Sequence, residues 1–367
     1  MSNIVHICQS TAHGPLNYAD LTSGGRGVTG SEQAMLYAAR AQARQGHQVV
    51  CYLPTNTPGV DEGVELIDIR SAWPLLRRVD RADVVVSWCT ADSLRMAPAK
   101  AIRIYNIQIN DFLLNGFKYE QYVDVCVCVS QAHQAHLWTE AGNPGPGAVV
   151  EIIPNGVELE RFRKPRKTVP RRCIYASSPD RGLHWLLAIW PEVRMTFPDA
   201  ELHVFYEVQA WLDNATLLHN EVGNRARYVI RRMGELQGHG VLMRGPMSPA
   251  QLASELLQAD LMLYPCDPIR FTEGFSVSTL EACAAGAIPV LTDADALGEI
   301  YGESGAVMVL RGDGRSWVDQ YLGTVLQLLG NVERESRRHT LQEFAARFGW
   351  EAVAARWEEV IAKHAKS

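Results

Sequence analysis

The sequence predicts an α/β protein made of two lobes, each built on a doubly wound parallel β-sheet. Three observations support this prediction. Short runs rich in β-branched residues alternate with longer helical patterns along most of the 367 residues. Several of these runs are apolar almost throughout, which is typical of strands covered on both faces. Alternation of strand and helix also calls for right-handed crossovers, and these produce parallel sheets.

The expected strands fall into two sets along the chain. The first set is 3–8, 48–53, 64–69, 83–88, 101–107, 124–129 and 149–153. The second set is 173–177, 201–206, 240–244, 260–265, 288–292 and 305–309. Helices are expected between many of them, for example over residues 31–45, where Gly46 ends the pattern. Residues 350–366 have the pattern of an amphipathic helix.

The boundary between the lobes is expected in the basic stretch between Pro154 and Cys173. Its cations are Arg161, Arg163, Lys164, Arg166, Lys167, Arg171 and Arg172. We interpret this stretch as a solvated interdomain linker. A patch for an anionic membrane surface or acceptor is the alternative. The expected organisation is therefore an N-terminal lobe over 1–160, a linker over 161–172, a C-terminal lobe over 173–347 and a terminal helix over 348–367.

Composition and charge restrict the class of protein. Hydrophobic residues make up 47% and charged residues 21%, as in ordinary globular proteins. The net charge of −6 makes nucleic acid an unexpected partner. No apolar run reaches the roughly 18 residues that a bilayer requires, and the N-terminus lacks the pattern of a signal peptide. The eight cysteines lie mostly in apolar runs without C-x-x-C spacing, so free buried thiols and a cytoplasmic location are expected.

A glycine-rich loop over residues 25–30 matches the pattern G-x-G-x-x-G. The pattern suggests a dinucleotide site, but a long loop separates Cys8 from Gly25, and the next strand ends without an acidic residue for a ribose. In the other interpretation, Gly25 and Gly27 let a ligand approach the backbone, and the following helix start offers N–H groups to a phosphate or sugar. A merely flexible loop is the third possibility.

The segment 272–293 is the most informative part of the chain. Seven residues separate Glu273 from Glu281, after an apolar strand and across the start of a helix. Eight residues span about 12 Å if helical, which is comparable to the distance from the sugar to the ribose of a nucleotide sugar. Glu273 can then accept hydrogen bonds from the sugar and Glu281 can hold the ribose hydroxyls. The N–H groups of residues 275–278 can receive the diphosphate. Two solvent-facing glutamates are the alternative.

Arg181 is the candidate cation for a diphosphate. It follows the expected strand CIYAS and precedes Gly182, which opens the next helix. An arginine can donate two parallel hydrogen bonds to phosphate oxygens. A cation is unfavourable at a helix N-terminus unless an anion binds there, which weakens the alternative of a surface arginine.

Taken together, these segments resemble the GT-B-fold retaining glycosyltransferases of family 4 over nearly the whole chain. EGFSVSTLEACAAGAIPV resembles the E-x(7)-E signature, the most specific match. GGRGVTGSEQAMLYAARAQARQGHQV resembles the N-terminal glycine loop and first helix, and VCVSQAHQAHL and IIPNGVELERF resemble segments before the linker. YASSPDRGLHWLLAIWPEVRMTFPDAELHVFY resembles the start of the nucleotide-binding lobe. FGWEAVAARWEEVI resembles the terminal helix that crosses back to the first lobe.

The resemblance implies two Rossmann-like lobes facing a central cleft, with the donor in the C-terminal lobe and the acceptor mainly in the N-terminal lobe. It implies transfer of a hexose from a UDP- or GDP-linked donor, with retention and without a metal or other cofactor. The acceptor would be a hydroxyl of a sugar, a lipid-linked molecule or a small molecule, and weak peripheral membrane contact is one option. The reaction would be same-face attack in which the leaving phosphate assists deprotonation of the acceptor.

The resemblance also assigns roles to residues by motif. Glu273 would contact the donor sugar, stabilising charge rather than acting as a nucleophile, and Glu281 would contact the ribose. Arg181 takes the place of the pyrophosphate-binding lysine. The donor-binding loop would comprise Gly274, Phe275, Ser276, Val277 and Ser278, while Gly25 and Gly27 would lie by the donor phosphates and acceptor.

Two departures from the family pattern affect the expected site. Many relatives carry a second basic residue shortly before the lysine, but residues 175–178 here read Tyr-Ala-Ser-Ser. Relatives also commonly place a histidine in a loop of the first lobe, where this chain reads IYNIQINDFLL. Gln108 and Asn110 are therefore candidate acceptor ligands. Asp111 is a candidate catalytic residue that would orient hydroxyl groups, with a helix N-cap as its alternative.

Asp293 and Asp295 form a D-x-D pattern like the metal motif of a different glycosyltransferase fold. After a strand beside the E-x(7)-E unit, it is better interpreted as a turn and helix N-cap, so no metal site is expected. Two other functions stay open at this point. One is an NAD(P)-dependent oxidoreductase, and the other is a catalytically silent protein that binds sugar nucleotides.

Overall fold

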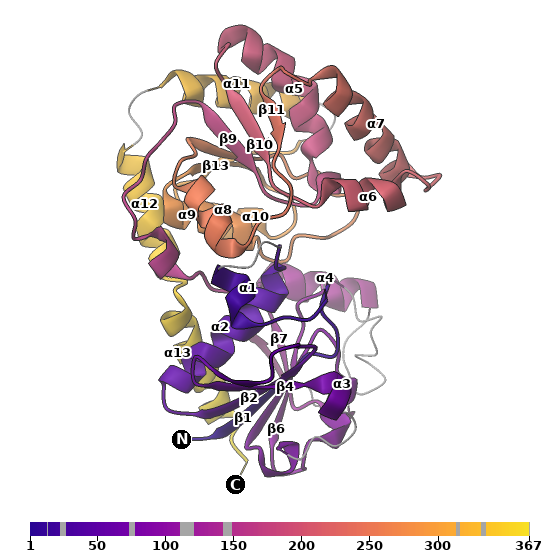
Figure 1. The fold of residues 1–367 in the computed structure, drawn as a ribbon, viewed down its shortest axis with the longest axis vertical. Coiled ribbons are helices and arrows are strands. Elements are labelled where there is room, and N and C mark those ends of the chain that lie inside the picture. Colours follow the sequence, from indigo (N-terminus) through magenta and orange to yellow (C-terminus); the bar gives the residue numbers. More distant parts are fainter. Residues whose placement is uncertain are drawn as a thin grey trace. The chain divides into compact units, whose positions relative to one another are not determined.

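The chain folds into two compact α/β units (Figure 1). The structure is a computed structural model that describes residues 1–12, 14–22, 27–72, 78–110, 121–141, 149–312, 316–331 and 335–366. Unit 1 is made of residues 1–22, Val28–Glu158 and residues 348–366, and unit 2 is made of Leu159–Arg347 together with Gly27. The chain therefore passes from unit 1 to unit 2 and returns for its last helix.

Unit 1 has an eight-stranded sheet in the order β3-β4-β2-β1-β5-β6-β7-β8, parallel except for the β3–β4 pair. Its strands are β1 (Asn3–Ile7), β2 (Gln48–Leu53), β3 (Gly59–Asp61), β4 (Val64–Asp68), β5 (Val84–Trp88), β6 (Ile102–Asn106), β7 (Val125–Cys128) and β8 (Val149–Ile152). Its helices are α1 (Tyr18–Thr22), α2 (Gly30–Arg44), α3 (Ile69–Ala72), η1 (Val79–Arg81), η2 (Asp92–Met96), α4 (Gln131–Ala141) and α13 (Trp350–Lys363).

Unit 2 has a six-stranded parallel sheet in the order β11-β10-β9-β12-β13-β14. Its strands are β9 (Arg172–Tyr175), β10 (Glu201–Val204), β11 (Val241–Met243), β12 (Leu261–Tyr264), β13 (Ile288–Thr292) and β14 (Val307–Val309). Its helices are η4 (Leu159–Phe162), η5 (Pro179–Arg181), α5 (Leu183–Thr196), α6 (Val208–Ala215), α7 (Glu221–Glu235), α8 (Pro249–Leu256), α9 (Val277–Ala285), α10 (Leu297–Tyr301), α11 (Ser316–Gly330) and α12 (Glu335–Ala346).

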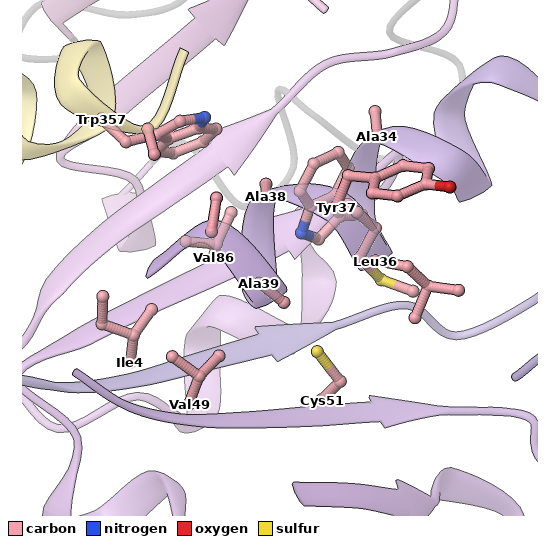
Figure 2. Close-up of a cluster of buried hydrophobic side chains, with 14 of the residues drawn as sticks. Ile4, Ala34, Leu36, Tyr37, Ala38, Ala39, Val49, Cys51, Val86 and Trp357 are labelled. Carbon is pink, nitrogen blue, oxygen red and sulfur yellow. The ribbon is translucent and has the colours of Figure 1, made fainter. Parts of the chain in front are cut away.

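The C-terminal helix α13 completes the core of unit 1. Its Trp357 lies in the same buried cluster as Ile4 of β1 and Ala38 of α2 (Figure 2). Trp350, at the start of α13, stacks on Tyr37 of α2 with the ring centroids 5.7 Å apart. Residues more than 300 positions apart in the sequence therefore share one hydrophobic core, and burial of two indole rings accounts for much of the stabilisation of this helix.

The strand order of unit 2 fixes where a ligand can bind. From β9 the chain moves to β10 and β11 on one side, and then returns to place β12, β13 and β14 on the other. The order thus reverses between β9 and β12, which pair in parallel. Crossover loops separate at the carboxyl ends of such a pair, and ligands of open α/β sheets bind there. The loops after Tyr175 and Tyr264 are consequently the place to search for chemistry.

The structure confirms the predicted α/β fold class with two parallel sheets, and every expected strand is present within two residues of its predicted ends. Helix α2 begins at Gly30, one residue before the prediction, because Thr29 is the N-cap and forms a capping box with Glu32. Strand β3 was not expected. Its three residues are all exposed and carry no apolar run, so the sequence pattern does not mark it.

The basic stretch 161–172 is only partly solvated, since Arg163, Lys164 and Lys167 are exposed but the other cations meet partners within unit 2. Arg161 is buried against Glu281, and Arg166 donates hydrogen bonds to the carbonyl oxygens of Ala285 and Ala259. Arg171 and Arg172 form ion pairs with carboxylates of the same unit. The expectation of a solvated linker therefore holds for three of the seven cations and is wrong for the others, because a run of cations shows charge but not which of its members will meet buried acceptors.

The eight cysteines are free thiols, as expected; Cys89 is half-buried and the others are buried. Burial raises the pKa of the Cys8 and Cys126 thiols to about 12, and that of Cys89 to about 11. These side chains serve as small core residues.

Candidate functional site

Glu273 occupies the loop between β12 and α9, at the switch point of unit 2. Its Oε2 accepts a hydrogen bond from Arg181 Nη1 at 3.1 Å and another from the hydroxyl of Tyr264, the last residue of β12. The Tyr264 hydroxyl in turn accepts a hydrogen bond from Ser177 at 3.1 Å. The structure thus brings together the two predicted residues Glu273 and Arg181, from the loops after β12 and β9.

The pair of Arg181 and Glu273 is sheltered but reachable. Glu273 is 5% exposed, whereas the Arg181 side chain keeps 27% of its surface exposed. Burial alone would lower the pKa of the Arg181 guanidinium, but the attraction of Glu273 and that of other neighbours such as Asp180 together outweigh burial and hold that pKa above its ordinary value. Within the described residues the Arg181 Nε has no hydrogen-bond partner. The side chain therefore stays cationic and has donor capacity left for an anion.

Gly182 allows the loops after β9 and β12 to approach each other. It is the N-cap of α5 with a φ of 123°, a conformation that favours glycine. A Cβ atom at this position would lie 2.0 Å from the carbonyl oxygen of Pro265. The predicted role of Gly182 as the start of a helix is confirmed, and the contact with Pro265 adds a steric reason for glycine.

The predicted donor-binding loop runs directly into helix α9. Gly274, Phe275 and Ser276 form the loop, and Val277 and Ser278 form the first helical turn. Within the described part of the chain, the Ser276 side chain makes no capping hydrogen bond to α9. Its hydroxyl accepts a hydrogen bond from Thr279 instead, at 2.9 Å. The positive end of a nine-residue helix therefore lies beside Glu273, as a phosphate site requires.

Glu281 lies about one turn along α9 and is not solvent-facing. It is 3% exposed, and its Oε1 accepts a hydrogen bond from Arg161 Nη1 at 3.0 Å. Burial raises the pKa of the Glu281 carboxyl to about 7, and the attraction of Arg161 only partly offsets this. Glu281 is therefore poised between its two protonation states near neutral pH.

The second aspartate of the D-x-D pattern acts on Glu273 and not on a helix end. Helix α10 begins at Leu297 with Ala296 as its N-cap, so the predicted N-cap role of Asp295 is wrong. Asp295 Oδ2 instead accepts the backbone N–H groups of Thr272 and Glu273, at 2.8 and 2.9 Å. The partners of this carboxylate therefore lie in the neighbouring loop and not in its own helix.

A second charged cluster supports the same loops. The carboxylate of Asp267 accepts hydrogen bonds from Trp185 at 2.9 Å and from Arg311 at 2.6 Å. Arg225 Nη1 donates to the carbonyl oxygens of Asp180 and Asp267. Helix α7 thereby ties together the loop that carries Arg181 and the loop that leads to Glu273.

The predicted site residues of the first lobe are only partly described. Gly25 and Asp111 lie outside the described residues, and Gly27 precedes the N-cap of α2. The side chain of Gln108 accepts a hydrogen bond from Asn155 at 3.1 Å, and the carbonyl oxygen of Asn110 bonds to His136. Gln108 thus belongs to a group of amides at the carboxyl edge of the unit 1 sheet, which suits hydroxyl-bearing ligands.

The start of α2 does not suit a dinucleotide. In such a site the helix after β1 presents its free N–H groups to a pyrophosphate. Here the carboxylate of Glu32 occupies that end, where it accepts the backbone N–H groups of Thr29 and Ala12 at 2.8 and 2.7 Å. A buried negative charge at this position would repel a pyrophosphate, so the oxidoreductase alternative is not favoured.

Several contributors to the site were missed from the sequence. Tyr264 was counted as part of an apolar strand, although a tyrosine at the carboxyl end of a central strand offers its hydroxyl to the site. Asp295 carried a usable signal as a carboxylate following the next strand. For Arg161 the sequence holds no such signal, because nothing in a run of basic residues shows which of them is buried.

Two kinds of feature are absent from the described residues. No group of three His, Cys, Asp or Glu side chains there is arranged to hold a metal ion. None of the described helices combines the length and apolar character that a bilayer crossing requires.

Comparison with known proteins places the site in a family. Residues 171–330, which contain Arg181, Glu273 and Glu281, match the family model described as "Glycosyl transferases group 1". This segment is thus similar to the group 1 glycosyltransferases. The family predicted from the E-x(7)-E segment is confirmed by this match.

Curated relatives agree with this assignment. The phosphatidyl-myo-inositol mannosyltransferase of Mycolicibacterium smegmatis is 27% identical over 218 residues, which cover 55% of this chain and 49% of that protein. The GDP-mannose:cellobiosyl-diphosphopolyprenol alpha-mannosyltransferase of Xanthomonas oryzae pv. oryzae is 30% identical over 215 residues, which cover 57% of this chain and 51% of that protein. The matches span about half the length of these curated relatives.

A solved structure agrees with the fold over the full length. AviGT4, a glycosyltransferase involved in avilamycin A biosynthesis, superposes with a TM-score of 0.69 at 18% identity, covering 98% of this chain and 97% of that one. At this identity the likeness concerns the fold, and the predicted GT-B class with two Rossmann-like units is confirmed.

Proposed function

We propose that the protein is a retaining glycosyltransferase that moves a hexose from a UDP- or GDP-linked donor to an acceptor hydroxyl without a metal ion. The observation that carries the proposal is the pairing of Glu273 with Arg181 beside the uncapped N-terminus of α9. A carboxylate for the sugar, a helix end for the diphosphate and a second carboxylate for the ribose then follow one another along the loop and helix α9. The guanidinium of Arg181 joins them from the loop after β9.

The proposed reaction uses these groups as follows. The bond between the anomeric carbon and the β-phosphate oxygen breaks, and positive charge develops on the sugar ring. Arg181 and the N–H groups of α9 stabilise the negative charge that accumulates on the departing diphosphate. The acceptor oxygen bonds to the anomeric carbon from the same face and gives its proton to the leaving phosphate oxygen. Glu273 orients the sugar and stabilises the positive ring without forming a covalent bond.

The names of the relatives rank the donors for a first test. Both curated relatives are mannosyltransferases by name, and one name specifies GDP-mannose. We therefore propose GDP-mannose as the first donor to examine and UDP-hexoses as the second. The acceptor is a hydroxyl of a sugar, of a lipid-linked molecule or of a small molecule. We further propose a cytoplasmic enzyme, since its eight cysteines are free thiols, as in a reducing compartment.

A donor panel tests the proposal. Melting temperature and release of nucleoside diphosphate are measured with GDP-mannose, UDP-hexoses and NAD(P), with and without a chelator. We expect stabilisation and slow donor hydrolysis with one sugar nucleotide, unaffected by the chelator, and none with NAD(P). Binding without hydrolysis or transfer to any acceptor would identify the silent alternative. Inversion at the anomeric carbon, read by proton NMR of the product, would contradict the proposed stereochemistry.

The pKa of Glu281, about 7, predicts how donor binding depends on pH. A carboxylate must be ionised to accept both ribose hydroxyls, so donor affinity should rise between pH 6 and 8, by up to about tenfold for a group titrating near 7. Donor affinity is measured by isothermal titration calorimetry with the Glu273→Gln variant, because this substitution prevents turnover. The ligand is the intact sugar nucleotide, because the terminal phosphate of a nucleoside diphosphate would itself titrate in this pH range. Glu281→Gln should remove the pH dependence, and an unchanged profile in that variant would contradict the assignment.

The stability of unit 2 should show the opposite trend. The ordinary pKa of a glutamate is 4.5, whereas that of Glu281 in the folded chain is about 7. Between these values the folded state holds more protons than the unfolded state, so this group's contribution to the free energy of unfolding falls as pH rises. Opposite slopes for donor affinity and for stability distinguish Glu281 from a residue that simply supports the fold.

A further inference from the structure

Asp295 contacts the backbone of Glu273 although it lies in a different loop. It follows β13, whereas Glu273 follows β12. The backbone of Asp295 has a φ of 52°, in the left-handed region that aspartate tolerates better than most side chains. In this conformation its Oδ2 accepts both the Thr272 and the Glu273 backbone N–H groups, at 2.8 and 2.9 Å.

Further hydrogen bonds join the same two loops. The backbone N–H of Ala296 donates to the carbonyl oxygen of Glu273 at 3.2 Å. The hydroxyl of Tyr301, at the end of α10, donates to the carbonyl oxygen of Ser276 at 2.6 Å. The loop from Thr272 to Ser276 is therefore anchored at both of its ends by the segment from Asp295 to Tyr301.

The loop that carries Asp295 is itself held in place. Asp293 Oδ1 accepts the backbone N–H of Arg311 at 2.8 Å, beyond the end of β14. The hydroxyl of Thr292, the last residue of β13, donates to the carbonyl oxygen of Cys266 at 2.6 Å. Asp295 therefore links the backbone of Glu273 to a loop that is itself fixed to the sheet.

We infer that Asp295 is a positioning residue for Glu273: by accepting two consecutive backbone N–H groups, it fixes the direction in which the Glu273 side chain leaves the backbone. The inference rests on the proposed function, in which the Glu273 carboxylate must face the sugar. Tyr264 and Arg181 hold the carboxylate itself, but Arg181 must also serve the diphosphate. The backbone anchor keeps Glu273 oriented when Arg181 turns to its anionic ligand.

Asp295→Gly tests the inference, because glycine adopts the same backbone conformation and only the carboxylate is lost. We expect kcat to fall about 10- to 100-fold, as misplacement of a reacting group by about 1 Å does. The KM for the donor should change less than about threefold, since α9 and Glu281 are untouched. Asp295→Asn keeps one acceptor oxygen and the tolerance for this φ, so it should restore kcat to within a few-fold of the natural value. Glu303→Gln, which changes an exposed carboxylate of the same unit, is the control and should leave kcat nearly unchanged.

The outcomes separate this inference from the proposed function. If the natural protein transfers sugar from no UDP- or GDP-linked donor, the proposed function fails. If Glu273→Gln is inactive while Asp295→Gly has the natural kcat, only the inference fails. A rise in KM and a loss of melting temperature in Asp295→Gly that Asp295→Asn does not reverse would show a merely structural role, and would also overturn it.

Discussion

Replacing Glu273 by glutamine should lower the kcat of transfer by about 100- to 1,000-fold, the loss typical of removing one preorganised charge-stabilising group. The side chain keeps its shape, and its amide oxygen can still accept the hydrogen bond from Tyr264. What is lost is the negative charge that faces the developing positive charge of the sugar. Arg181, released from its ion pair, keeps its charge for the diphosphate, so donor affinity should fall little or even rise.

Single-turnover kinetics and donor titration separate these effects. A large fall in kcat with a donor dissociation constant within a few-fold of the natural value is the expected pattern. Glu303→Gln, which changes an exposed carboxylate of the same unit, is the matched control and should behave as the natural protein. A Glu273→Gln protein that binds the donor poorly but turns it over at the natural rate would assign Glu273 to ground-state binding instead.

The largest loss of stability is expected from Gly182→Ala. The new methyl group would lie 2.0 Å from the carbonyl oxygen of Pro265 and 2.8 Å from its carbon, at a φ of 123° that disfavours any side chain. Strain in the backbone and displacement of the β12 loop should together lower the free energy of unfolding of unit 2 by about 3–5 kcal/mol. Arg181 directly precedes this position, so donor binding should weaken as well.

Urea unfolding followed by circular dichroism measures this loss. Gly234→Ala is a matched control, because Gly234 lies inside helix α7 with no atom within 4 Å of the position of its Cβ. There the same methyl group should be neutral, or should stabilise the protein by about 0.5–1 kcal/mol through the preference of alanine for helix. Equal effects of the two substitutions would show that the close contact at Gly182 relaxes easily.

The sequence predicts the fold well because its signals are local and repeated. Apolar β-branched runs such as DVVVSW mark buried strands regardless of what they pair with, and glycines and caps mark helix ends. The proximity of Glu273 and Arg181 could also be predicted from the sequence, because both residues follow strands whose carboxyl ends meet at one edge of a sheet.

What the sequence could not supply is the partner of each side chain. Asp295 was assigned to its own helix because a local pattern was the only guide, whereas its true partners lie in a loop more than 20 residues earlier. Arg161 was assigned to solvent for the same reason, although Glu281 lies 120 residues away in the sequence. Whether a polar side chain bonds to a local or to a distant partner is decided by tertiary structure, and patterns in a single sequence do not contain this information.

The burial of the cysteines gives each unit its own internal reporter of opening. Thiolates, and not thiols, react with alkylating agents, so a buried thiol with a raised pKa reacts only when the surrounding structure opens. Among the buried thiols, unit 1 contains Cys8, Cys51, Cys126 and Cys128, and unit 2 contains Cys173, Cys266 and Cys283. The rate at which a thiol reagent modifies each set therefore measures the local unfolding of one unit at a time, in the natural protein and without an added label. A donor that binds in unit 2 would slow modification of the second set.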